Sequence, residues 1–82
     1  MSKSEALAHL TVMERTYNIK IKNKEEVAEA IAEKALETGV EPIHICTAIN
    51  TWLAQRISQG EVEENEEIEI PREMIENIRV KE

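Results

Sequence analysis

Apolar residues recur along this chain at two different spacings, which separate helical from extended segments. From Lys24 to Thr38, and again from Pro42 to Ser58, they fall three or four positions apart, the spacing of one buried helix face. From Asn18 to Lys22 they alternate with polar residues, as in a strand with one buried side. The pattern therefore predicts a short strand followed directly by two helices. The apolar stripe of the first helix is Val27, Ala30, Ile31, Ala35 and Leu36, and Cys46 stands at the margin of the buried face of the second.

Residues with strong local preferences stand at the ends of the two predicted helices. Asn23 is suited to cap the first helix, with Glu26 three residues later to complete a capping box. Gly39 is suited to the left-handed turn that ends this helix, and Pro42 to the first turn of the next. Gly60 follows the second helix. The connection between the helices is short, so we expect them to pack as neighbours.

Two further segments flank this central unit. Residues 4–17 predict an amphipathic helix whose apolar stripe is Leu7, Leu10, Met13 and Tyr17, widened by Val12. After Gly60 comes an acidic run, which predicts a solvated linker, and Pro71 then opens a short amphipathic helix. We divide the chain into an N-terminal helix (1–17), a strand–helix–helix core (18–60) and an acidic linker with a C-terminal helix (61–82).

The order strand, helix, glycine turn, helix resembles the ribbon-helix-helix DNA-binding family, the Arc and MetJ type of repressor. The resemblance covers residues 18–59 and rests on the spacing of apolar positions around Gly39. It implies a mainly α homodimer in which two strands pair between chains, here with an added N-terminal helix and an acidic C-terminal extension. The dimer core that it implies is Ile19, Ile21, Val27, Ile31, Ala35, Ile45, Ile49, Trp52 and Leu53.

The resemblance also implies a function, sequence-specific binding of duplex DNA by a transcriptional regulator or repressor. Asn18, Lys20 and Lys22 would reach base edges in the major groove. Lys24 and the start of the second helix, at Ile43 and His44, would contact DNA phosphates. Glu41 stands where the family often has a hydroxyl, and a carboxylate beside a phosphate is repulsive.

The C-terminal segment predicts a second partner. An acidic tail after a ribbon-helix-helix domain looks like the layout of toxin–antitoxin antitoxins, in which the tail binds a protein. By that likeness, residues 61–82 would bind a protein partner through Met74, Ile75 and Ile78, ordering as they bind. The same three residues are equally suited to docking on their own domain.

A second interpretation needs no DNA. Residues 67–70 alternate Glu and Ile, and pairing them with the Asn18–Lys22 strand would place Glu beside Lys on the exposed side. The result is a small α+β domain with an intrachain two-stranded sheet. Its function would be that of an acidic protein–protein interaction module or inhibitor, including one that imitates nucleic acid with its glutamates.

Charge separates these interpretations. The net charge is −7, from 17 glutamates and no aspartate against ten basic residues, whereas a DNA-binding domain usually carries a basic surface. Residues 61–82 hold nine glutamates and three basic residues, a net of −6. Residues 1–60 hold eight glutamates and seven basic residues, so the proposed DNA-binding part is close to neutral.

The sequence offers little for catalysis. It has no glycine-rich phosphate loop and no nucleophile beside a base in a known motif, so we expect no enzyme and no cofactor. His44 and Cys46 are two positions apart on a helix, so their side chains diverge and we expect no metal site. No apolar run is long enough to span a membrane. The single cysteine suits a reducing compartment, and we expect a cytoplasmic protein.

Overall fold

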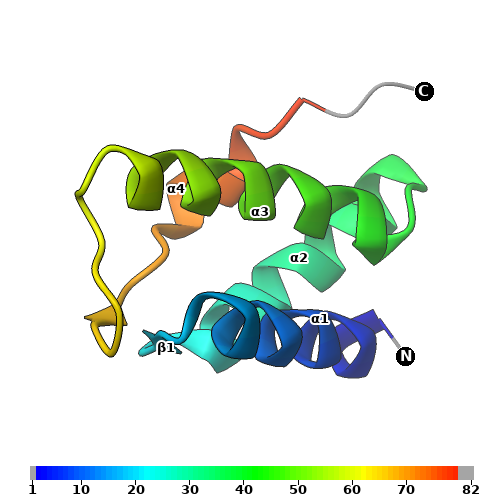
Figure 1. Cartoon of the computed structure of the whole chain (residues 1–82). Coiled ribbons are helices and arrows are strands. Elements are labelled where there is room, and N and C mark those ends of the chain that lie inside the picture. Colours follow the sequence, from blue (N-terminus) through cyan, green and yellow to red (C-terminus); the bar gives the residue numbers. More distant parts are fainter. Residues whose placement is uncertain (1, 80–82) are drawn as a thin grey trace.

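The computed structural model describes residues 2–79 and is mainly helical (Figure 1). Three long helices, α1, α2 and α3, precede a fourth, short helix α4, and the two strands are short. The elements in chain order are α1 (Ser2–Tyr17), β1 (Lys20–Ile21), α2 (Lys24–Thr38), α3 (Pro42–Ser58), β2 (Glu67–Ile68) and α4 (Arg72–Glu76). In Figure 1, α1 and α3 lie below and above, with α2 crossing between them.

The helix boundaries expected from local signals are confirmed. α2 and α3 have the predicted bounds, and α1 begins two residues earlier than predicted. Gly39 takes a left-handed conformation (φ 76°), and its N–H bonds the carbonyl of Ala35, which closes the end of α2. Pro42 occupies the first turn of α3. Local chemistry therefore fixes where these helices stop and start.

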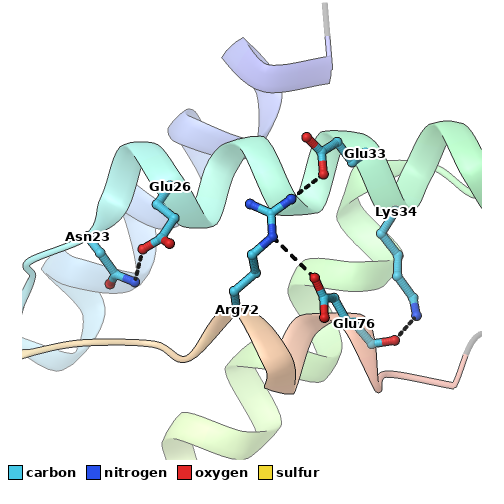
Figure 2. A network of polar contacts seen from close by, with 6 residues as sticks. All are labelled: Asn23, Glu26, Glu33, Lys34, Arg72 and Glu76. Atoms are coloured by element: carbon cyan, nitrogen blue, oxygen red, sulfur yellow. Dashed lines mark hydrogen bonds and ion pairs between the residues drawn. The ribbon is translucent and has the colours of Figure 1, made fainter.

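The capping box predicted at the start of α2 is wrong in its detail. Asn23 holds the N-cap position, but its side chain caps no backbone N–H of the helix; the Asn23 Nδ2 donates instead to a carboxylate oxygen of Glu26 (3.1 Å; Figure 2). The same Nδ2 also donates to the backbone oxygen of Ile70 (2.8 Å), and the Asn23 Oδ1 accepts from Ile70 N–H (3.0 Å). Asn23 therefore holds the C-terminal segment. Its bonds to the Ile70 backbone use both the NH₂ group and the oxygen of the side-chain amide, whereas N-capping uses only the oxygen.

The sheet forms within the chain. β1 pairs with β2 in parallel, with Lys20 opposite Glu67 and Ile21 opposite Ile68. Lys20 N–H bonds the carbonyl of Glu66 (3.0 Å), and Lys22 N–H bonds that of Ile68 (2.7 Å). The strand pairing of the second interpretation is therefore present, although the predicted strand, residues 18–22, is reduced to two residues.

The second edge of β1 is occupied by Glu14 of α1. The N–H of Ile19 donates to the Glu14 carbonyl (3.0 Å), and the N–H of Ile21 donates to a Glu14 carboxylate oxygen (2.8 Å). Lys24 Nζ lies 2.7 Å from the other carboxylate oxygen. One residue therefore saturates the donors that β2 leaves free, and β1 has no open edge.

The core lies between the three long helices and is closed by the C-terminal segment. Its buried members are aliphatic apart from Met13 and Cys46, and the described part of the chain buries no charged side chain. Leu10, Val27, Ile31, Ile45, Ile49, Leu53, Ile70 and Ile75 are the largest side chains that are almost completely buried. Ile70 and Ile75 belong to this list, so residues after Gly60 form part of the same core.

Two apolar residues assigned to helix stripes lie outside the core. Val12 is 61% exposed and Leu36 is 87% exposed, so both expectations of burial were wrong. Each follows the helical spacing, but no neighbouring element covers its side chain; Val12 lines a shallow groove between α1 and α3. Trp52, expected in the core, is half-buried and packs against it. Cys46, expected at the margin, is buried.

The C-terminal segment is tied along the length of α2, as Figure 2 shows. Beyond the Asn23 clamp, Arg72 forms ion pairs with Glu33 of α2 and with Glu76. Lys34 Nζ donates to the backbone oxygen of Glu76 at the end of α4 (2.6 Å). The predicted linker, residues 61–67, is instead folded into bends and turns, and its last residue, Glu67, belongs to β2; its glutamates are exposed, but Val62 is buried.

Candidate interaction surfaces

The residues expected at DNA bases lie at and beside β1. Lys20 and Lys22 are exposed, and within residues 2–79 neither forms an ion pair. Asn18 is exposed and left-handed (φ 53°), and its carbonyl accepts a bond from the N–H of Asn65. The structure therefore leaves the two lysines available while it uses Asn18 to hold the chain after α3.

The residues expected at DNA phosphates are not gathered in one place. Lys24 is engaged by Glu14 and also lies 3.3 Å from Thr11 Oγ1. Ile43 and His44 lie exposed in the first turn of α3, where His44 N–H already bonds the Glu41 carbonyl (3.0 Å). Glu41 holds the N-cap position without a side-chain cap. A carboxylate therefore stands at the helix end where an anion would bind.

The residues expected in a dimer core form the core of one chain. All except Trp52 are at most 6% exposed without a second copy. The partner-binding residues expected in the tail behave similarly: Ile75 is completely buried, and Met74 and Ile78 pack against the core as partly buried side chains. In the single chain these groups therefore stabilise the fold and present little apolar surface.

Charge is segregated between the elements. Together, α2 and residues 61–76 hold thirteen of the sixteen glutamates in residues 2–79. With the basic residues of α2 and of residues 61–79, these segments carry a net charge of −9, whereas the other described residues carry +2. The glutamates of α2 and α4 meet beside Arg72, where Glu33, Glu37 and Glu76 line one hollow. We call α2, α4 and residues 61–69 together the acidic side; Lys3, which pairs with Glu25 and Glu29, and Lys20, which lies opposite Glu67, border it.

The outer edge of β2 is open. The carbonyls of Glu66 and Ile68 face β1, so the backbone groups of Glu67 and Glu69 face away from it, by the alternation of an extended strand. Within residues 2–79, the backbone of these two glutamates has no hydrogen bond on that side. Both side chains are exposed. The edge therefore combines free backbone donors and acceptors with negative charge.

A second surface, which sequence reasoning missed, lies between α1 and α3. A shallow groove of 190 Å³ is lined by His9, Val12, Met13, Ile43, Cys46, Thr47 and Asn50. A second groove adjoins it along α3, lined by Asn50, Thr51, Ala54, Gln55, Ser58 and Gln59. None of these side chains carries a carboxylate. We call the two grooves and the residues that line them the α1–α3 face. The sequence feature that could have indicated this surface is the absence of acidic residues from the whole of α3.

Residues 2–79 contain no group of three side chains that could hold a metal ion. Burial raises the pKa of the Cys46 thiol to about 11, so at neutral pH it is an unreactive thiol. None of the helices described combines the length and apolarity needed to cross a membrane.

Comparisons with protein-family models, with curated proteins and with solved structures found no match to this chain.

Proposed function

We propose that this chain is a non-catalytic module that binds a basic segment of a partner protein on its acidic side. The observation that carries the proposal is the segregation of charge, −9 on α2 and the C-terminal segment against +2 elsewhere. Such separation attracts and orients a basic partner and speeds its encounter. We therefore expect charge complementarity to select the partner.

The open edge of β2 supplies the place where that segment docks. An extended peptide can add to a sheet edge through backbone hydrogen bonds, while its side chains select the partner. Glu67 and Glu69 flank the edge, so a peptide with lysine or arginine at alternate positions would pair with them. A second β2 strand is disfavoured there, because it would set glutamate against glutamate.

The test is fluorescence anisotropy with a labelled peptide of alternating lysine and threonine, titrated at about 50 to 200 mM salt, a range in which charge attraction weakens measurably. We expect binding that falls as salt rises. Methylating the backbone nitrogens on one edge of the peptide should abolish it, and methylating those on the other edge should not. Absence of peptide binding even at low salt would refute the proposal.

A matched pair of variants separates the site from the overall charge. Glu67→Lys with Glu69→Lys removes the edge glutamates, and Glu5→Lys with Glu41→Lys changes the net charge equally at distant exposed positions. We expect the first variant to weaken peptide binding about tenfold or more, worth about 1.4 kcal/mol, and the second to weaken it far less. If both double variants lost the same affinity, the peptide would be bound by the net charge of the chain and not by the edge of β2.

Duplex DNA binding is the second candidate function, favoured by one observation. Lys20 and Lys22 are exposed beside one another on β1 and just after it, and within residues 2–79 neither forms an ion pair. The same titration with a mixed-sequence duplex in place of the peptide tests it, since phosphate neutralisation must appear as a negative slope of log affinity on log salt. Binding to the duplex that is lost in Lys20→Ala with Lys22→Ala would establish this function instead.

A further inference from the structure

We propose that two copies of this chain associate through the α1–α3 face, α3 packing against α3 of the second copy. This inference is independent of the proposed binding of a basic segment, because it uses the opposite kind of surface. Two of the three exposed large apolar side chains of the described chain, Val12 (61% exposed) and Ile43 (42%), stand on this face. The third, Leu36, stands alone on α2.

Charge identifies the occupant as a second copy. Two molecules of net charge −7 repel each other, and the repulsion is smallest where neither presents a carboxylate. α3 has no acidic residue along its seventeen positions, and its only charged side chain, Arg56, is paired with Glu61 (2.5 Å). A strongly basic partner would find nothing to pair with on this face. An identical, uncharged face is a suitable partner.

The shape of the face favours a two-fold arrangement. Thr47, Thr51, Ala54 and Ser58 are small and lie along the outward side of α3, so a second helix can approach closely. With the axis near Asn50 and the helices antiparallel, Ile43 of each copy would enter the groove beside Ala54 and Ser58 of the other. A two-fold interface of this kind uses the same surface on both copies.

The size of the face sets the expected strength. A helix of seventeen residues is about 25 Å long, and two adjacent helices are about 20 Å wide, which gives about 500 Å² per copy. The total of about 1,000 Å² lies at the lower limit for a specific interface. We therefore expect a dimer with a dissociation constant of about 10 to 100 µM, formed reversibly as concentration rises.

The experiment is sedimentation equilibrium of the full chain, from about 1 µM to about 1 mM. We expect the mean mass to rise from monomer to dimer, and to rise at lower concentration when salt is increased, because salt screens the repulsion between two acidic molecules. This direction is opposite to that expected for a basic peptide or DNA. Failure of dimerisation can therefore be distinguished from failure of basic-segment binding, because the two processes depend on salt in opposite directions.

Three single substitutions locate the interface. Val12→Glu and Ile43→Glu each place two carboxylates in a two-fold interface, so we expect both variants to stay monomeric across the range. Leu36→Glu makes the same change at a more exposed side chain on α2, and this variant should dimerise as the wild type does. All three side chains are exposed, and circular dichroism checks that each variant is folded. If Ile43→Glu is unfolded, the oligomeric state of Val12→Glu alone tests the interface.

Two results would overturn the proposal. The first is a wild-type chain that remains monomeric at the highest concentration in both low and high salt. The second is a dimer that survives Val12→Glu, or that Leu36→Glu weakens as much, since either would place the contact on another surface.

Discussion

Removing the Glu14 side chain tests the contact that closes the second edge of β1. The carboxylate joins three elements: it belongs to α1, accepts from Ile21 N–H of β1 at 2.8 Å and pairs with Lys24 of α2 at 2.7 Å. Only 17% of the Glu14 side chain is exposed, against 32% for Lys24. These two bonds are therefore better protected from water than the other ion pairs of the described chain.

The expected magnitude follows from what each substitution leaves behind. Glu14→Gln keeps an oxygen for Ile21 N–H but loses the charged bond to Lys24, which in this partly exposed setting costs about 1 kcal/mol. Glu14→Ala also leaves the N–H of buried Ile21 without an acceptor, so the total loss is about 2 kcal/mol. For a chain of this length, each kcal/mol corresponds to about 4 to 8 °C in Tm.

The assay is urea denaturation followed by the fluorescence of Trp52 and by circular dichroism, with Glu29→Ala as the matched control. Glu29 also lies within a helix and near a lysine, 3.8 Å from Lys3, but both side chains are about half exposed. That variant should lose less than about 0.5 kcal/mol. If Glu14→Ala lost no more than Glu29→Ala, Glu14 would have no special part in holding β1.

The effect should depend on pH. Burial alone would raise the pKa of Glu14, but the bonds from Lys24 and Ile21 N–H, with the charges of Lys24 and Lys20, hold it below its ordinary value. A lowered folded-state pKa means that the stabilisation is fully present above the unfolded value, about 4.3, and is lost as pH falls through the folded value. The difference between wild type and Glu14→Gln should thus be constant near neutrality and shrink in acid.

Two further predictions concern the C-terminal clamp and the buried thiol. Asn23→Ala removes both bonds to Ile70, and we expect the free energy of unfolding to fall by about 2 kcal/mol. Amide exchange should become faster at Ile68 and Ile70 than in α3. Unchanged exchange at these residues would show that the bonds to Asn23 are dispensable. Cys46 should react with a thiol reagent at neutral pH about a hundredfold more slowly in the native chain than in urea, because burial raises its pKa and blocks access. A native rate within tenfold of the denatured rate would contradict this expectation.

What could be predicted from the sequence is mostly what neighbouring residues decide. Gly39 and Pro42 mark the end of α2 and the start of α3 because backbone conformation at each is a local matter. The apolar spacing of α2 likewise identified Val27, Ile31 and Ala35 as buried. These features need no knowledge of the rest of the chain.

The remaining features depend on contacts between distant residues. Asn23 has the local signature of a helix cap, yet its amide bonds Ile70, 47 positions away. Val12 and Leu36 have the spacing of buried residues, but periodicity cannot tell which side of a helix will be covered. The absence of acidic residues from α3 can be seen in the sequence, but the grooves of the α1–α3 face arise only when the two helices are placed side by side, so the grooves could not be foreseen.

The folded chain also sets a free-energy condition on the ribbon that the sequence resemblance implies. An intermolecular strand pair needs an open edge on β1, and both edges are occupied, one by β2 and one by Glu14. Releasing β2 and the segment after it would expose Ile68, Ile70 and Ile75, each at most 8% exposed now. Burying such a side chain contributes about 2 kcal/mol, so the release costs about 6 kcal/mol before any hydrogen bond is counted. A ribbon dimer must recover that cost, whereas a dimer through the α1–α3 face leaves the sheet intact. Amide exchange at Ile68 and Ile70 in the dimer therefore distinguishes the two: it stays slow if the second copy docks on α3, and becomes fast if β2 has been displaced.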